Sequence, residues 1–154
     1  MPIIHRSLLV PYTVSQMYTL VNHIEAYPEF LPWCKSSHIL SLTEDEVRAR
    51  LVLAHSGFEK SFDTCNRLQK DKMIEIRLLN GPFRILEGFW KFEQVEQDNR
   101  QNMCQVTLDL EFEFISKLVG LMIGPLFHPA VNTLVDAFSK RAITVYGPAT
   151  LHSN

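Results

Sequence analysis

The chain has 154 residues, of which 46% are hydrophobic and 21% are charged, and its formal net charge is −2. This composition is typical of a globular protein and too apolar for a disordered one. The near balance of charges gives no overall electrostatic reason to bind nucleic acid, so we expect no DNA partner. A local basic patch on the surface is still compatible with this balance. Cys34, Cys65 and Cys104 are far apart and form no cysteine–histidine cluster. We therefore expect reduced thiols, no metal site and no disulfide framework.

The N-terminal segment, residues 1–12, is apolar but lacks the features of a signal peptide. The longest apolar run, 118–127, is about half as long as the roughly 20 residues that a membrane span requires. These observations predict a cytoplasmic protein, with peripheral contact with the inner membrane as an open alternative. Because no repeat or linker interrupts the chain, we expect one domain over 1–147 and a short tail over 148–154.

The N-terminal part carries signals for one strand and two short helices. Residues 3–10 are rich in aliphatic and β-branched side chains, which predicts a first strand. Thr13 and Gln16 have the spacing of a capping box that opens a short helix. Pro28 and Pro32 then permit at most one further helical turn before the chain becomes extended.

The middle of the chain, from about residue 36 to residue 114, alternates between apolar and polar side chains. A period of two is typical of antiparallel strands with one buried face. The alternation is clearest where Val106, Leu108 and Leu110 are interleaved with Thr107 and Asp109. We expect six strands in this region, over residues 36–43, 46–54, 58–68, 72–79, 85–95 and 103–114.

The C-terminal third changes to a helical period. Phe127, Val131, Leu134 and Phe138 follow spacings of three and four, and the pair at 147–148, glycine then proline, should stop the helix. A sheet with one apolar face needs a cover, and this is the longest amphipathic helix predicted. The sequence therefore predicts an α+β fold: a curved, seven-stranded antiparallel sheet with two short N-terminal helices and one long C-terminal helix.

Three motifs in this order resemble one family closely: YPEFLPWC at 27–34, NGPFRILEGFWKF at 80–92 and DAFSKRAITVYG at 136–147. The chain resembles the coenzyme-Q-binding START-like family over about residues 2–147. This family includes mitochondrial quinone-binding proteins and bacterial ribosome association toxins, which are also described as oligoketide cyclases or lipid-transport proteins. The resemblance implies a helix-grip (START/SRPBCC-like) fold with a hydrophobic tunnel for ubiquinone or a similar polyprenyl lipid, in support of respiration. For bacterial members it also implies binding to the large ribosomal subunit and a block of subunit association.

The positions expected to face the helix carry no ionisable side chain, so they offer no acid or base for catalysis. Each buried CH₂ contributes about 0.8 kcal/mol, which lets an isoprenoid chain bind without hydrogen bonds. We therefore expect a non-catalytic carrier of a polyprenyl quinone that requires no cofactor, with the ribosome-binding toxin as the alternative and a polyketide cyclase as a weaker one. Individually these side chains fit a filled core better than a ligand contact, and only the family resemblance implies a cavity. The predicted lining residues are Ala49, Leu51, Leu53, Ile76, Leu78, Trp90, Phe92, Leu110, Phe112, Phe127, Val131, Leu134 and Phe138.

Two segments could guard the entrance to such a cavity. Pro32 fixes the backbone next to Trp33, whose indole suits either a tunnel mouth at a membrane interface or a packing anchor. The apolar segment 118–127 contains two glycines and a proline, which weaken a helix. We favour a lid that rests on a bilayer over the alternative, a buried, kinked first turn of the long helix. The predicted lid residues are Leu118, Leu121, Met122 and Ile123.

Basic side chains on the polar face of the strand at 46–54 are candidates for surface contacts. Arg48 and Arg50 alternate with the apolar positions and should point away from the helix. A basic outer face could meet ribosomal RNA or anionic lipid head groups, although most such faces are only solvated.

Overall fold

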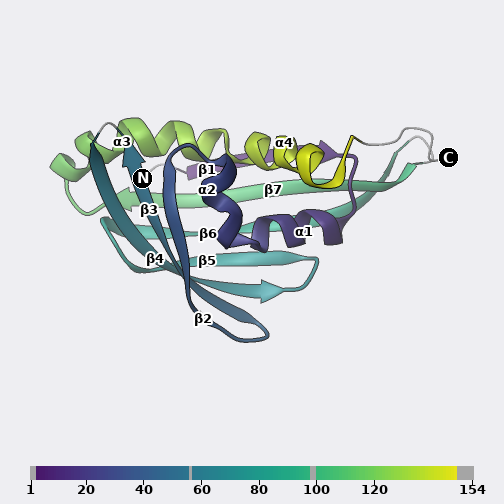
Figure 1. Ribbon diagram of the computed structural model, residues 1–154, viewed down its shortest axis with the longest axis horizontal. Helices are drawn as coiled ribbons and strands as arrows, with labels where there is room; N and C mark the ends of the chain where they lie inside the picture. The colour runs from purple at the N-terminus through teal and green to yellow at the C-terminus, as the bar shows by residue number, and fades with distance from the viewer. Residues whose placement is uncertain (1–2, 56, 98–99, 149–154) are drawn as a thin grey trace.

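The computed structural model describes residues 3–55, 57–97 and 100–148 (Figure 1). A seven-stranded antiparallel sheet has the strand order β1-β7-β6-β5-β4-β3-β2, and α3 and α4 lie end to end along one of its faces (Figure 1). The elements are β1 (Ile3–Val10), α1 (Val14–Asn22), the 3₁₀ helix η1 (Ile24–Ala26), α2 (Tyr27–Phe30), β2 (Cys34–Leu42), β3 (Glu46–His55), β4 (Phe58–Gln69), β5 (Met73–Asn80), β6 (Phe83–Gln97), β7 (Arg100–Phe114), α3 (Lys117–Asn132) and α4 (Leu134–Tyr146).

The predicted fold class is confirmed, because each predicted strand is present and the sheet is continuous. The capping box also forms: the Gln16 backbone N–H donates to Thr13 Oγ1 over 3.0 Å, and the Thr13 N–H donates to Gln16 Oε1 over 2.9 Å. The division into a domain over 1–147 and a tail over 148–154 stays a prediction, since the tail beyond residue 148 lies outside the described residues.

Strands β6 and β7 approach each other closely at Gly88, which pairs with Leu110. A Cβ atom at this position would lie 1.9 Å from the carbonyl oxygen of Asp109 on β7. No side chain can occupy that space, so glycine is required for the close approach of the two strands. On the opposite side of the sheet, β2 has two register irregularities against β3, which bend this edge strand.

The C-terminal helix differs from the prediction in being divided in two. Helix α3 ends at Asn132, and α4 begins at Leu134 with its axis bent by 52° from that of α3. Thr133 occupies the break, and its hydroxyl donates to the Pro129 carbonyl over 2.8 Å. A threonine hydroxyl that donates to the carbonyl four residues earlier in a helix favours bending of that helix. The expected stop is confirmed, because α4 ends at Tyr146 and Gly147 has a φ of 86°.

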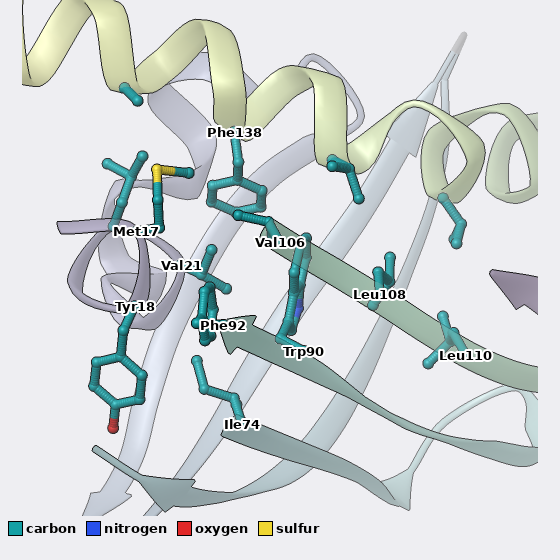
Figure 2. Close-up of a cluster of buried hydrophobic side chains, with 14 of the residues drawn as sticks. Met17, Tyr18, Val21, Ile74, Trp90, Phe92, Val106, Leu108, Leu110 and Phe138 are labelled. Atoms are coloured by element: carbon teal, nitrogen blue, oxygen red, sulfur yellow. The ribbon is translucent and has the colours of Figure 1, made fainter. Parts of the chain in front are cut away.

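Helix α4 is fixed to the rest of the protein by aromatic side chains. Phe138 is fully buried, and its ring packs edge-on against Trp90 of β6 at 5.3 Å between ring centroids. Figure 2 shows Phe138 pointing from α4 onto this cluster, beside Met17 and Val21 of α1. At the end of α4 the Tyr146 hydroxyl donates to the Gln16 carbonyl over 2.8 Å. These contacts join α4 to both α1 and the sheet.

In the described part of the chain, no single helix is long and apolar enough to cross a membrane. The bent pair of α3 and α4 together has a length and composition compatible with a broken span.

Candidate functional site

A cavity of about 90 Å³ lies between the inner face of the sheet and the helices. Strands β3 to β7 provide its floor, and the region around the break between α3 and α4 provides its roof. Several predicted lining residues meet here because the period-two pattern turns them to the same face of the curved sheet. The predicted residues that line it are Ala49, Leu51, Ile76, Trp90, Leu110, Phe127, Val131 and Leu134.

Other predicted residues lie on the correct face but outside the cavity wall. Leu53, Phe112 and Phe138 have no exposed surface, and Phe92 is buried with them in the packed core. Leu78 is half-buried and packs against that core. These five positions fill the spaces beside the cavity, as the interpretation of a filled core expects. Their role in lipid binding stays a prediction.

Sequence reasoning missed part of the wall. Residues from the N-terminal helices approach the cavity from the side, and β4 contributes Phe62, Thr64 and Asn66. These three residues alternate with outward-facing residues along β4. The sequence feature that could have predicted them is therefore a period-two pattern in which two of the inward positions are polar. The lining residues that were not predicted are Val21, Ile24, Tyr27, Phe62, Thr64, Asn66, Ile74, Leu86 and Ala130.

Asn66 is the most unusual side chain of the wall. It is 9% exposed, and its Oδ1 atom is buried without a hydrogen-bond partner among the described residues. Its neighbours across the sheet are Val47 on β3 and Ile76 on β5, which have only hydrocarbon side chains. Thr64, two residues earlier on β4, is 6% exposed and faces the same way. The floor of the cavity therefore has a polar spot on β4.

In the described part of the wall, Tyr27 is the one titratable side chain. Its hydroxyl donates to the Val21 carbonyl over 2.5 Å. Burial, with a smaller contribution from Cys34, raises the pKa of the Tyr27 hydroxyl well above its ordinary value. The phenol therefore stays protonated and committed to a backbone carbonyl at neutral pH, where it cannot act as a base.

The predicted entrance residues are spread over two places. Trp33 is half-buried and lines the cavity, and Pro32 next to it is exposed. In the first half of α3, Leu118 and Leu121 are 68% and 76% exposed, and Met122 is 51% exposed. Ile123, on the other side of α3, is fully buried and does not line the cavity. The roof comes instead from the second half of α3 and the first residue of α4.

Arg48 and Arg50 point outward from β3, and carboxylates neutralise both. Arg50 forms a two-point ion pair with Asp63 on β4, with N–O distances of 2.8 and 3.0 Å. Arg48 Nε donates to Glu46 over 3.1 Å on the same strand. The Asp63 side chain is only 12% exposed, so the pair with Arg50 also satisfies a largely buried carboxylate. The outer face of β3 is thus less basic than its sequence suggests.

Residues 10–139 match the family described as polyketide cyclase / dehydrase and lipid transport. The chain belongs to this family. Its relatives include the ribosome association toxin RatA of Pseudomonas aeruginosa, which is 43% identical over 144 residues that cover 94% of this chain and 97% of RatA. The resemblance inferred from the three motifs is therefore confirmed. The coenzyme Q-binding protein COQ10 homolog B of Xenopus laevis is 27% identical, over 92% of this chain and 58% of the Xenopus protein.

Solved structures of the polyketide cyclase and lipid-transport fold agree with the architecture. An 18 kDa protein of Caulobacter crescentus superimposes with a TM-score of 0.71 at 29% identity, over 96% of this chain and all of the other. The Zhui aromatase/cyclase of a Streptomyces species superimposes with a TM-score of 0.73 at 14% identity, over 92% of this chain and 93% of the other. The second likeness shows that an enzyme can share this fold, so catalysis has to be judged from the cavity itself.

Proposed function

We propose that the chain binds and carries a polyprenyl quinone, with ubiquinone as the preferred ligand, and makes or breaks no bond in it. The observation that carries this proposal is the mostly apolar cavity between the sheet and the α3–α4 roof. Apolar contacts there suit an isoprenoid chain, since each buried CH₂ contributes about 0.8 kcal/mol. The coenzyme Q-binding name of the Xenopus relative supports this choice of ligand.

The absence of an available acid or base in the described wall supports a carrier over a cyclase. Ring closure of a polyketide needs a group that moves a proton at the substrate. Tyr27 is the one titratable group of the described wall, and its raised pKa and its bond to the Val21 carbonyl keep it neutral. Asn66 and Thr64 can form hydrogen bonds but do not titrate near neutral pH.

Loading requires the cavity to become larger. A volume of about 90 Å³ is smaller than the roughly 150 Å³ of an engineered cavity that accepts benzene. We place the hinge at Thr133, because the helix axis changes direction there by 52° and α4 is fixed by Phe138 and Tyr146. Movement of α3 then requires the Phe127 ring to leave its contacts with Phe83 and Phe112 on the sheet. In our proposal α3 swings away from the sheet about this break, and the exposed Leu118, Leu121 and Met122 then contact the bilayer that supplies the lipid. The protein would thus act in the cytoplasm and at the inner membrane.

The first test is mass spectrometry of the organic extract of the protein, purified from its native host without detergent. We expect an isoprenoid quinone in stoichiometric amount. An empty extract, together with failure to bind added short-chain ubiquinone, would overturn the proposal. Ala49→Trp and Val131→Trp each place an indole in the cavity and should abolish quinone binding. Arg48→Glu changes only the outer face and serves as the matched control, with circular dichroism confirming that all variants fold.

A second candidate function is binding to the large ribosomal subunit. The observation that favours it is the 43% identity to the P. aeruginosa protein named ribosome association toxin RatA. This function needs an exposed surface, for which Arg48 and Arg50 on β3 are the candidates. Co-sedimentation with purified large subunits tests it: Arg48→Glu and Arg50→Glu should release the protein from the subunits, while Ala49→Trp should leave binding intact. The opposite pattern would favour a role for the cavity in both activities.

A further inference from the structure

We infer that Thr64 and Asn66 form a head-group subsite, which binds an oxygen-bearing lipid head against β4 and directs the apolar tail toward the α3–α4 roof. The inference rests on the carrier function proposed above and specifies which part of the ligand goes where. The carrier proposal requires only apolar contacts and leaves the direction of the lipid open.

The amide oxygen of Asn66 lies in the cavity wall without a hydrogen-bond partner among the described residues. A buried polar atom without a partner costs free energy, so such atoms are rare in folded proteins. Asn66 is 9% exposed and its Oδ1 has no partner among the described residues, although the residue lies in the cavity wall. Its neighbours on β3 and β5, Val47 and Ile76, offer no hydrogen bond from their side chains. A ligand group is therefore the partner that this site lacks.

A trapped water is a poor substitute for that ligand. A buried water typically needs two to four polar partners. Apart from aromatic side chains, the described wall offers Thr64 and Asn66, and residues two apart on a strand are separated by roughly 6–7 Å along it. The Tyr27 hydroxyl is already bonded to the Val21 carbonyl. A larger group with oxygen on a ring or chain end reaches both β4 side chains more readily than one water does.

The opposite wall explains the direction of the tail. The roof over the cavity consists of Phe127, Ala130, Val131 and Leu134, which present hydrocarbon only. A hydroxyl or carbonyl placed there would lose its hydrogen bonds to water without replacement. An amide both donates and accepts, so Asn66 can bond either a carbonyl or a hydroxyl oxygen once its plane is turned to suit. The class of ligand is accordingly an isoprenoid with an oxygenated head, bound head-inward.

The test compares two probes with one isoprenoid skeleton: farnesol, which carries a hydroxyl, and farnesene, which does not. Dissociation constants are measured by equilibrium dialysis. For the wild-type protein we expect farnesol to bind about tenfold more tightly, as one hydrogen bond to a buried group allows. In Asn66→Leu the preference should fall to about one, with farnesene affinity unchanged. Ile76→Val is the matched control, because it trims an apolar neighbour and should weaken both probes equally while keeping the preference.

Each other outcome overturns a defined part of the argument. If Asn66→Leu still prefers farnesol, the lipid head binds elsewhere. If the wild type binds both probes with equal affinity, no head-group subsite exists. Either result leaves the carrier proposal standing. If neither probe nor short-chain ubiquinone binds the wild type, the carrier proposal fails and the subsite with it.

A measurement without ligand makes the test independent of binding. Removing an unpaired amide should raise the melting temperature of Asn66→Leu by roughly 2–4 °C. A fall would reveal that Asn66 has a structural partner, which also overturns the inference. Thr64→Val, a change of nearly equal shape, is the second variant if Asn66→Leu does not fold, and it should reduce the farnesol preference in the same direction.

Discussion

Filling the cavity should stabilise the protein and block its ligand at the same time. Ala130 lies in the roof on α3 and is 8% exposed, facing a space of about 90 Å³. Ala130→Leu adds three carbon atoms, each contributing up to about 0.8 kcal/mol when buried. Ordering the leucine side chain costs about 0.5–1 kcal/mol. We therefore expect the free energy of unfolding to rise by about 1–2 kcal/mol, while short-chain ubiquinone loses most of its affinity.

Urea denaturation measures the first effect through the transition midpoint, provided that the slope with denaturant is unchanged. Ala137→Leu is the matched control, because Ala137 is half-buried on α4 and lines a surface groove instead of the cavity. It should change the stability by less than about 0.5 kcal/mol and leave binding intact. If Ala130→Leu destabilises the protein by more than about 1 kcal/mol, the space beside Ala130 is already filled, and our reasoning about the cavity is refuted.

Gly88→Ala should destabilise the protein by at least about 1–3 kcal/mol, because the new Cβ would lie 1.9 Å from the Asp109 carbonyl oxygen; an unchanged urea midpoint would contradict this contact. Burial raises the pKa of the Cys34 and Cys104 thiols to about 11. At pH 8 a thiol-specific reagent should therefore react first with the half-buried Cys65, and rapid labelling of Cys34 or Cys104 would refute the assignment. Between about pH 9 and 11 the unfolded chain has lost the protons of Cys34 and Cys104 while the folded protein still holds them. The free energy of unfolding should therefore fall as the pH rises through this range. A urea midpoint that stays constant across this range would contradict that sign.

The fold could be predicted because apolar and polar side chains alternate regularly along its strands. Along β7, residues such as Leu108 and Phe112 face the core in strict period two, and no polar residue interrupts them. The division between α3 and α4 could not be predicted in this way. The apolar stripe continues from Val131 to Leu134 across the break, so the side-chain period hides the backbone bend at Thr133.

The cavity could be predicted only in part, because periodicity identifies a face and not the space in front of it. Leu51 and Leu53 point to the same side of β3, yet one borders the cavity and the other is closely packed. The difference depends on how far the helices stand from each position, which is a tertiary property. Thr64 and Asn66 were not predicted because inward positions of a strand are expected to be apolar, and both of these side chains are polar.

The ion pairs on the outer face of β3 determine how this surface responds to salt. When a free cationic side chain reaches a phosphate, the nucleic acid releases a condensed counterion, and each such contact steepens the fall of affinity with salt concentration. Arg48 and Arg50 already hold Glu46 and Asp63, so a phosphate has to displace a carboxylate first. The displaced carboxylate then attracts a cation from solution, which offsets the counterion that was released. RNA bound through this face would therefore show a shallower salt dependence than two free arginines would produce.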